Sequence, residues 1–440
     1  MSHVFPRHTK ISPPRAVSGS GCYIYDANGK AYLDGSGGAA VSCLGHGDQD
    51  IIAAVQHQTE RLAFAHTGFF TSDPAEALAD LLVKHAPGDL TRAYFVSGGS
   101  EAVEAAIKLA RQYHVENGQP ERCHLIARKQ SYHGNTLGAL AAGGNEWRRS
   151  QFEPLLINVS HISPCYEYVL KNDDETAFDY GQRAAQELED EILRLGPKTV
   201  MAFIAEPVVG ATLGAVPAVE GYFRRIREIC DRYGALLILD EVMCGMGRTG
   251  HLFAYEAEQV VPDILCIAKG LGAGYQPIGA MLCSSAVYEK IEFGSGMFQH
   301  GHTYIGHPVA TAAGHAVVSK LVDQNLSKRS AEKGETLRAA LVDRFGRHPH
   351  IGDIRGRGLF LGLELVQDRE AKSTFPADLK LAAKIKAAAF EAGLICYPMP
   401  GTRDGKNGDH VLLAPPFIIS DTQITELVDK LETAFSTALT

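Results

Sequence analysis

Long apolar runs are absent from the chain, and so is an excess of positive charge. The longest apolar stretches, at 200–205 and 235–239, fall far short of the roughly 20 residues that a membrane-spanning helix needs. Residues 1–15 include basic residues and prolines but no apolar signal core. We therefore expect a protein that neither crosses a membrane nor carries a secretion signal.

The charge balance is acidic, because 42 Lys and Arg stand against 51 Asp and Glu, for a net charge of -9. Proteins that bind nucleic acid usually present a basic face, so this balance argues against a nucleic-acid partner. The nine cysteines contain no C-x-x-C pair, and Cys230, Cys266 and Cys283 lie in apolar runs where cysteine is typically a small buried residue. This usage predicts a reducing, cytoplasmic compartment.

A chain of 440 residues exceeds the size of one ordinary hydrophobic core, which predicts two domains. Near the start, residues 23–26 and 30–33 flank Asn28-Gly29, a pair that favours a type I′ hairpin turn. From about residue 90, short apolar strands alternate with amphipathic helices, which predicts a parallel sheet covered on both faces. We expect these strands at 93–96, 200–205, 235–239 and 264–268, and the helices at 101–114 and 221–233.

The pattern changes beyond about residue 310. Helical periodicity there surrounds a few short strand patterns, which is typical of a smaller α+β domain. We expect helices at 310–322, 331–345, 379–392 and 421–437, and strands at 358–365 and 410–413.

Three predicted strand ends of the first region carry residues suited to chemistry, and open α/β sheets bind ligands at these ends. The loop 97–100 (Ser-Gly-Gly-Ser) leads into a helix, whose free N–H groups suit a phosphate. The same loop is also consistent with a plain turn in which Ser100 caps the helix. Glu101 would repel a phosphate, so its side chain is expected to point elsewhere. No Gly-Lys-Ser/Thr ends the loop, which excludes a Walker motif.

Lys269 and Asp240 follow two other apolar strands. Desolvation lowers the pKa of a lysine and favours the neutral nucleophile that a Schiff base needs, although a lone lysine in this position is more often solvated. A buried aspartate needs a cationic partner such as a protonated pyridine nitrogen, unless it caps the next turn. Together with the loop, the two residues predict a cofactor site. The glycines at 270, 272 and 274 do not form G-x-G-x-x-G, which argues against an NAD-dependent oxidoreductase.

Three histidines, His300, His302 and His307, include a His-x-His spacing that can bind zinc. No cysteine or carboxylate lies near them in the sequence, so we predict no metal site.

A series of different short motifs occurs in a fixed order along the chain. This series resembles that of the class III aminotransferases, which include ornithine, γ-aminobutyrate and ω-amino acid aminotransferases. This group belongs to the fold type I pyridoxal-phosphate (PLP) enzymes, and the resemblance covers nearly the whole chain. The motifs are YLDG (32–35), GHG (45–47), SGGSEA (97–102), YHG (132–134), EP (206–207), LDEV (239–242), GRTG (247–250), AKG (268–270), HTY (302–304), GHP (306–308) and RGRGL (355–359).

The resemblance implies an α/β fold with a large PLP-binding domain over 49–312 and a small domain built from 1–48 and 313–440. It also implies a set of site residues. Lys269 would carry PLP as a Schiff base and shuttle protons, Asp240 would pair with the pyridinium, and Tyr132 and Val242 would cover the two ring faces. Gly99 and Ser100 would hold the phosphate, His133 and Glu206 would lie beside the cofactor, and Thr303 would reach the phosphate of a neighbouring subunit.

By the same resemblance the enzyme is a homodimer with shared active sites, possibly paired into a tetramer. Its reaction moves an amino group from an amine donor to a 2-oxo acid in two half-reactions with ping-pong kinetics. A racemase, an aminomutase or a decarboxylase on the same fold is the alternative.

The donor is predicted from departures from the family pattern. The Glu that pairs with the carboxylate-binding arginine in γ-aminobutyrate and ornithine relatives is absent after 206–210, which favours the ω-amino acid branch. Ala40 stands in a loop where relatives often have large residues, and Phe70 resembles a substrate-lining aromatic. Arg403 is the candidate for the substrate carboxylate, with Lys406 second and a solvated loop charge as the simpler interpretation. We expect an ω-amino acid or diamine donor, with pyruvate slightly favoured over 2-oxoglutarate as acceptor.

Overall fold

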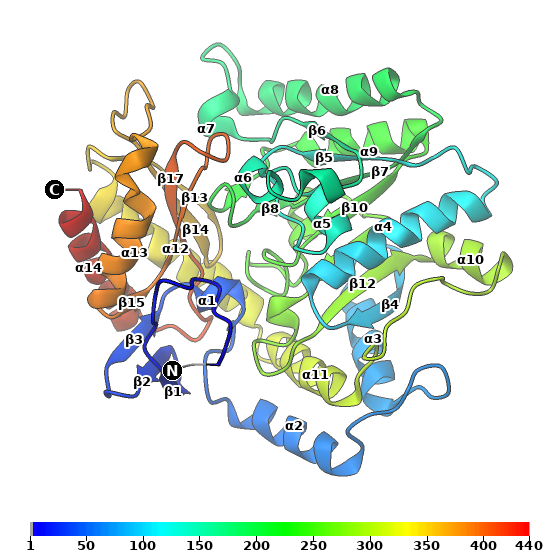
Figure 1. Ribbon diagram of the computed structural model, residues 1–440, viewed down its shortest axis with the longest axis horizontal. Coiled ribbons are helices and arrows are strands. Elements are labelled where there is room, and N and C mark those ends of the chain that lie inside the picture. The colour runs from blue at the N-terminus through cyan, green and yellow to red at the C-terminus, as the bar shows by residue number, and fades with distance from the viewer. Residues whose placement is uncertain (1–2, 440) are drawn as a thin grey trace.

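A seven-stranded sheet forms the centre of the computed structural model, which describes residues 3–439 (Figure 1). Six strands run in the same direction, and only β12 is antiparallel to its neighbours. In spatial order the strands are β4 (Leu90–Val96), β12 (Gly279–Ser284), β11 (Ile264–Ile267), β10 (Leu236–Asp240), β7 (Val200–Ala205), β5 (His124–Arg128) and β6 (Val159–Ile162).

Alternate residues of the central strands enter two separate cores, as expected for a sheet covered on both faces. Ile238 packs with the buried face of helix α4 (Gly99–Glu116), whereas Leu237 and Leu239 pack with helices α8 and α9 on the other side. The helices of this region are α2 (Gln49–Arg61), α3 (Asp73–His85), α4, α5 (Leu137–Ala142), α6 (Glu146–Arg149), α7 (Glu167–Leu170), α8 (Ala177–Leu195), α9 (Tyr222–Tyr233), α10 (Ser285–Phe293) and α11 (Pro308–Asp323).

The two ends of the chain meet in a second sheet, where β15 (Leu394–Ile395) pairs in parallel with β3 (Ala31–Asp34). Figure 1 shows these N-terminal strands beside the C-terminal helices, at the left of the molecule. The remaining elements are β1 (Ala16–Ser20), β2 (Tyr23–Asp26), β13 (Ile351–Arg357), β14 (Phe360–Leu365), β16 (Tyr397–Pro400), β17 (Asp409–Leu413), the pair β8 (Val208–Val209) and β9 (Val216–Pro217), and the helices α1 (Gly37–Ala40), α12 (Leu326–Phe345), α13 (Leu381–Glu391) and α14 (Asp421–Ala438).

The strands and helices expected from the sequence are present, with ends that shift by a few residues. The hairpin between β2 and β3 is also present, but its turn differs from the prediction. A type I′ turn needs a positive φ at both central residues, and only Gly29 has one, at 80°. Asn28 instead donates its N–H to Asp26 Oδ1, so a side-chain contact stabilises a longer connection.

Within residues 3–439, none of the helices combines the length and the apolar character needed to span a bilayer. The domain boundaries at 48 and 312 stay a prediction.

Gly334 offers a test of how tightly α12 packs on the β13–β14 turn. A Cβ at this position would lie 2.2 Å from the backbone of Gly358, which is itself held against the backbone of Arg248 and Thr249. Gly334→Ala is therefore expected to lower the free energy of unfolding by about 1–3 kcal/mol through overpacking. Thr336→Ala, at an exposed position of the same helix, should change it by less than about 0.5 kcal/mol. Denaturant titration of both variants measures the difference, and equal stabilities would contradict the packing described.

Candidate active site

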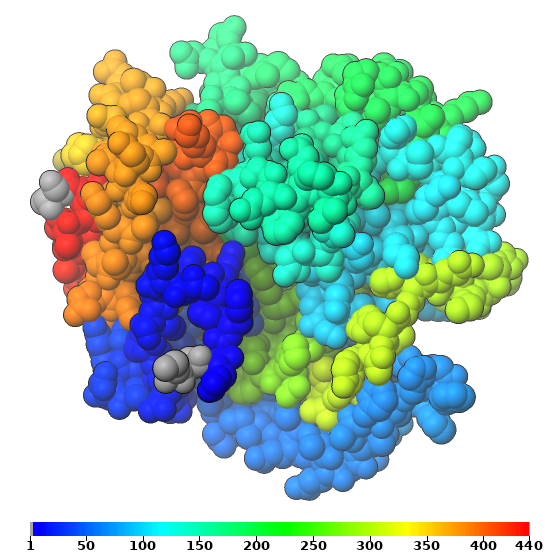
Figure 2. Space-filling view, in the orientation of Figure 1, coloured from blue at the N-terminus to red at the C-terminus, as the bar shows by residue number. Residues whose placement is uncertain are grey.

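One cavity of about 1600 Å³ lies at the carboxyl ends of the central strands. Glu206 follows β7, Asp240 ends β10 and Lys269 follows β11, and these three strands are neighbours in the sheet. Figure 2 shows the dark-blue N-terminal segment at the front of the molecule, and its residues Phe5 and Arg7 also line the cavity. The predicted residues brought together in its wall are Gly99, Ser100, Tyr132, His133, Glu206, Asp240, Val242 and Lys269.

Lys269 occupies a strained backbone position, with a φ of 47°, at the start of a short 3₁₀ turn (Lys269–Leu271). Desolvation lowers the pKa of its amine to about 8 from an ordinary 10.5, although Asp240 and Glu206 act in the opposite direction. A lysine that loses its proton this readily is available as a nucleophile near neutral pH. Positive φ is uncommon outside glycine and is often found at functional sites.

The Asp240 carboxylate is 3% exposed and has two fixed partners. Its Oδ2 lies 2.8 Å from His133 Nδ1, and its Oδ1 accepts the Val242 N–H at 3.0 Å. Such contacts hold a buried carboxylate in one orientation while leaving lone pairs on both oxygens. His133 is also buried, and its Nε2 has no hydrogen-bond partner among the described residues.

Glu206 brings a second carboxyl group to the cavity. Burial, together with the negative charge of Asp240, raises the pKa of Glu206 to about 7. Its Oε1 receives a long contact from the Gly210 N–H at 3.5 Å, and its Oε2 has no partner within the described chain. A carboxyl group that keeps its proton close to neutral pH can donate a hydrogen bond into the cavity.

The loop before α4 is shaped for close approach to an anion. Gly98 has an extended backbone, and no side chain among the described residues caps the helix, so its first N–H groups are not used by the helix itself. A Cβ on Gly99 would lie 2.6 Å from Val242 Cγ1. Glu101 accepts the Ser97 N–H at 2.7 Å, so its carboxylate stays at the base of the loop, and it does not line the cavity. These features suit a phosphate group.

Tyr132 and Val242 both line the cavity, and the Tyr132 ring has an unpredicted neighbour. The Arg148 guanidinium lies over this ring, 4.6 Å from its centre. An aromatic ring, a branched side chain, a buried carboxylate, a lysine of lowered pKa and a helix N-terminus together match the chemical groups of PLP, which combines a pyridine ring, an aldehyde and a phosphate.

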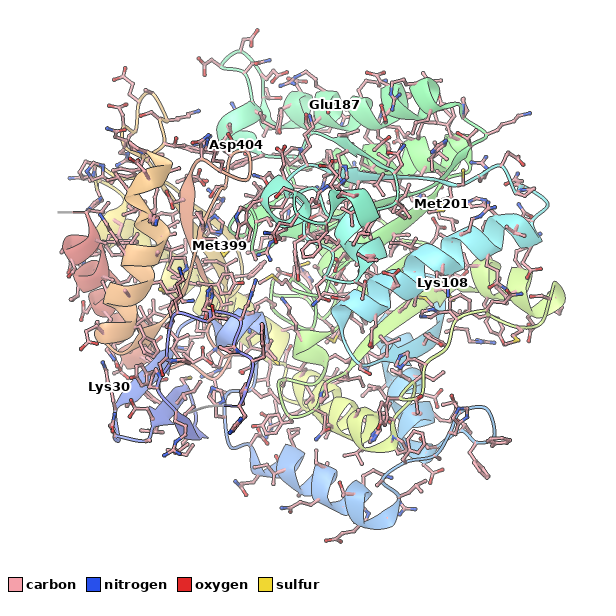
Figure 3. The ribbon with its side chains drawn as sticks, in the orientation of Figure 1. Lys30, Lys108, Glu187, Met201, Met399 and Asp404 are labelled. Carbon is pink, nitrogen blue, oxygen red and sulfur yellow. The ribbon has the colours of Figure 1, made fainter. Side chains whose placement is uncertain are left out.

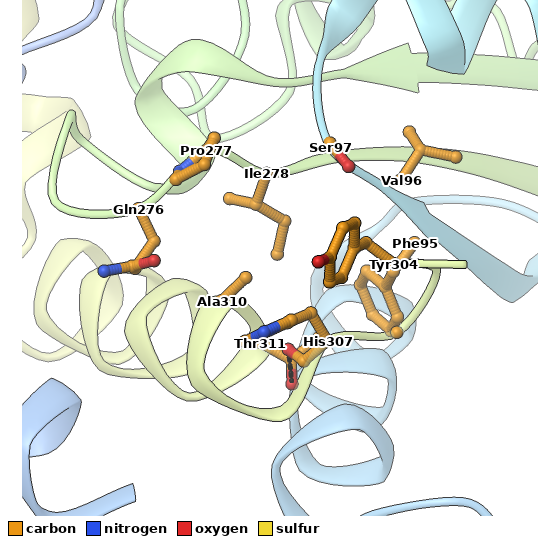
Figure 4. Close-up of a pocket in the computed structure, with 11 residues that line it drawn as sticks. Phe95, Val96, Ser97, Gln276, Pro277, Ile278, Tyr304, His307, Ala310 and Thr311 are labelled. Carbon is orange, nitrogen blue, oxygen red and sulfur yellow. Dashed lines mark hydrogen bonds between the residues drawn. The ribbon is translucent and has the colours of Figure 1, made fainter. Parts of the chain in front are cut away.

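Thr303 and Phe70 lie outside this cavity and are exposed on the surface of the chain. Thr303 belongs to the loop before α11, beside a smaller cavity of about 210 Å³ that Figure 4 shows between Phe95, Tyr304 and His307. The two cavities share Ser97 and residues 276–278. The predicted roles of Thr303 and Phe70 depend on a second subunit and stay predictions.

Two residues predicted to contact the substrate, Ala40 and Arg403, do not line the cavity. Ala40 is 2% exposed and belongs to a buried cluster with Phe360 and Leu412, and its neighbours Ala39 and Val41 line the cavity instead. A positive φ of 62° turns the Ala40 side chain into the core. The sequence alone could not show that the Ala40 side chain points into the core and not into the cavity.

Arg403 is likewise absent from the cavity wall. Its Nε lies 3.2 Å from Glu364 Oε1, and its guanidinium lies over the rings of Tyr166 and Tyr168. A buried carboxylate partner therefore holds this arginine elsewhere. The runner-up Lys406 lines an adjoining cavity of about 770 Å³. Sequence reasoning missed Arg148, because no motif marks it.

The chain matches the family described as aminotransferase class III over residues 6–435. It is 46% identical over 431 residues to an uncharacterized aminotransferase of Schizosaccharomyces pombe, which covers 98% of this chain and 94% of the relative.

Two solved structures superimpose closely. A thermostable (S)-enantioselective ω-transaminase from Thermomicrobium roseum gives a TM-score of 0.93 at 37% identity, covering 100% of this chain and 97% of that one. The ω-transaminase of Pseudomonas jessenii in complex with PMP gives a TM-score of 0.92 at 32% identity, covering 99% and 96%. The predicted fold class is thus confirmed. The protein belongs to the class III aminotransferases, a PLP-dependent enzyme family of fold type I that acts on amines and oxo acids.

Proposed function

We propose that this enzyme transfers an amino group from an ω-amino acid, a diamine or a related amine to a 2-oxo acid, with pyruvate slightly favoured, and that it uses PLP. The observation that carries the proposal is the meeting of Lys269, whose amine pKa is lowered to about 8, with the buried Asp240 carboxylate in one large cavity.

PLP, when bound, supplies a ring that withdraws electrons from the carbon that carries the amine. Lys269 would hold it covalently, Asp240 would keep its ring nitrogen protonated, and His133 would orient Asp240 through the 2.8 Å contact. Tyr132 and Val242 would enclose the ring. The N–H groups of Gly99 and Ser100, with Thr303 from a second copy of the chain, would hold the phosphate.

The chain's own chemistry is a proton transfer. With its amine free, Lys269 Nζ would take a proton from the amine-bearing carbon of the donor and later return one. A base with a pKa near the operating pH suits both directions. Glu206, whose pKa is raised to about 7, can donate a hydrogen bond into the cavity when it is protonated. Because the amino group stays with the enzyme until the oxo acid enters, the kinetics are ping-pong.

A homodimer is part of the proposal. Phe69, Phe70 and Tyr304 are 81%, 67% and 59% exposed, and Tyr304 borders the smaller cavity beside the phosphate loop. Exposed aromatic clusters of this kind mark interaction surfaces. A second copy covering them would bring its Thr303 to the site. Pairing of dimers into a tetramer and the cytoplasmic location stay predictions.

The function is tested by the absorption spectrum of the purified protein without an oxo acid. We expect a yellow protein whose visible band disappears when a suitable amine is added, and the effective amines identify the donor class. Lys269→Ala should still take up PLP but should not lose its band with any amine in the same time. A wild-type protein that takes up no PLP contradicts the proposal. A yellow protein that no amine bleaches favours a racemase, an aminomutase or a decarboxylase.

Asp240→Asn is expected to lower the rate of the half-reaction by a factor of at least about 100, because a neutral amide cannot stabilise a protonated ring nitrogen. Glu206→Gln, measured at pH 6, should cost less than about tenfold, because the native Glu206 is already mostly protonated there. Stopped-flow absorbance with one amine gives both rates. Asp240→Asn retaining more than a tenth of the wild-type rate would remove Asp240 from the proposed role.

Lys269 should also show its lowered pKa in the cofactor-free protein. Its folded-state pKa of about 8 lies below the ordinary 10.5, so the neutral amine dominates above pH 8. Labelling by an amine-reactive reagent, followed residue by residue with mass spectrometry, should rise with a midpoint near pH 8 at Lys269. The exposed Lys290 serves as the reference residue. A midpoint at Lys269 of 10 or above would contradict the desolvation described.

A further inference from the structure

Arg148, in the short helix α6, places a positive charge in the wall of the Lys269 cavity. It forms no ion pair with any carboxylate of residues 3–439, and its buried Nε has no hydrogen-bond partner among them. Its guanidinium carbon lies over the Tyr132 ring, 4.6 Å from the ring centre, and 5.8 Å from the centre of the Trp147 ring. Contacts of this kind with ring faces use the positive charge and leave the N–H groups of a guanidinium available for an anion.

The backbone that carries Arg148 is fixed by buried hydrogen bonds. Asn145 accepts the Arg148 N–H at 3.2 Å through Oδ1 and donates from Nδ2 to Gln130 Oε1 at 2.7 Å. Gln130 in turn donates to the Gly401 carbonyl at 2.7 Å. This chain connects the end of β5, helix α6 and the loop after β16. The side chain of Arg148 is therefore presented from a rigid base, which reduces the entropy lost on binding a ligand.

Other cations near the cavity are less suited to bind a substrate carboxylate. Arg403 is held by Glu364 at 3.2 Å and does not line the cavity. Arg7 lines it, but this residue is exposed in a segment without helix or strand. Lys269 itself is reserved for the reaction. Arg148 is the cation that combines a fixed position, a cavity-facing guanidinium and no carboxylate partner.

A second cavity of about 770 Å³ continues from the same point. Arg148, Trp147 and Tyr397 line both cavities, so they form the boundary between them. Figure 3 labels two residues of the second cavity, Met399 and Asp404, on the side of the C-terminal strands. Its lysines outnumber its acidic residues: Lys380, Lys386 and Lys406 against Glu146 and Asp404. This excess of positive charge attracts an anionic substrate group toward Arg148.

We propose that Arg148 binds the carboxylate of the amine donor at the end distal to the amine, so that the donor is an ω-amino acid and not a diamine. The inference rests on the proposed function, because the amine end of such a donor must reach Lys269. With its amine at Lys269, the donor extends past Tyr132, and its carboxylate pairs with the free edge of the Arg148 guanidinium where the two cavities meet. A guanidinium fork matches a carboxylate and offers nothing to a second ammonium group.

The test measures equilibrium binding to the PLP-loaded enzyme with ligands that cannot react. Pentanoate carries the carboxylate without an amine, and pentanamide is its neutral analogue of the same length. Calorimetry should show that the wild type binds pentanoate more tightly than pentanamide. Arg148→Gln should lower the affinity for pentanoate at least tenfold, which corresponds to about 1.4 kcal/mol. Binding of pentanamide should change less than twofold. Arg148→Lys, which keeps the charge but loses the fork, should lie between the two.

Lys108→Gln is the matched control for the loss of one positive charge, because Lys108 is exposed on α4 outside the cavity (Figure 3). It should bind pentanoate within twofold of the wild type. The proposal is overturned if Arg148→Gln binds pentanoate as the wild type does, or if the wild type binds pentanoate no better than pentanamide. Thermal unfolding and the visible cofactor band report whether Arg148→Gln is folded and loaded. If Arg148→Gln is not folded and loaded, the affinities of Arg148→Lys for pentanoate and pentanamide are compared with those of the wild type instead.

A second measurement separates this inference from the proposed function. In the half-reaction without an oxo acid, 5-aminopentanoate and pentylamine differ only in the carboxylate. Arg148→Gln should raise the half-saturating concentration of 5-aminopentanoate at least tenfold and leave that of pentylamine within twofold. Failure of every amine to bleach the wild type counts against the proposed function alone, because the pentanoate result still decides the role of Arg148.

Discussion

The chemistry of this structure depends on one physical constraint: ionisable groups are buried away from water at one edge of the central sheet. Asp240 is almost fully buried, and a carboxylate in such a place is costly unless it is paired and hydrogen-bonded. The imidazole of His133 and the N–H of Val242 meet that need at 2.8 and 3.0 Å. The same environment lowers the pKa of Lys269 and raises that of Glu206, so the groups become reactive through one common cause.

The sheet brings these groups together by simple geometry. Strands β11, β10 and β7 are neighbours that run in the same direction, with Asp240 opposite Cys266 and Leu239 opposite Ala205. Adjacent strands lie about 4.8 Å apart, so residues that follow their carboxyl ends share one edge. Lys269 and Asp240 could therefore be assigned to one site from the sequence, since each lies at the end of an apolar strand, whereas the assignment of Glu206 depends on the family resemblance. The loop before α4 also follows an apolar strand, β4, so the same pattern indicates it.

The residues that line the part of the cavity far from Lys269 could not be predicted from the strand pattern. It is built from α6, from the loop after β16 and from the N-terminal segment, elements that no strand periodicity relates to one another. The sequence predicts Arg403 as the partner of the substrate carboxylate, yet Glu364, on β14, holds it away from the cavity. Arg148 belongs to a helix of only four residues with no motif of its own. Its position depends on contacts among Asn145, Gln130 and Gly401, which are distant in the sequence.

The sequence by itself determined the alternation of strands and helices, the order of the chemical groups along the chain and the family, because these depend on local patterns and short motifs. Only the tertiary structure decided which way Ala40 points, that Asn28-Gly29 closes a longer turn, and that Arg148 lines the cavity whereas Arg403 does not. Those outcomes depend on positive φ angles and on hydrogen bonds and ion pairs between distant segments. Such contacts are selected by the packing of the whole molecule, and no local pattern records them.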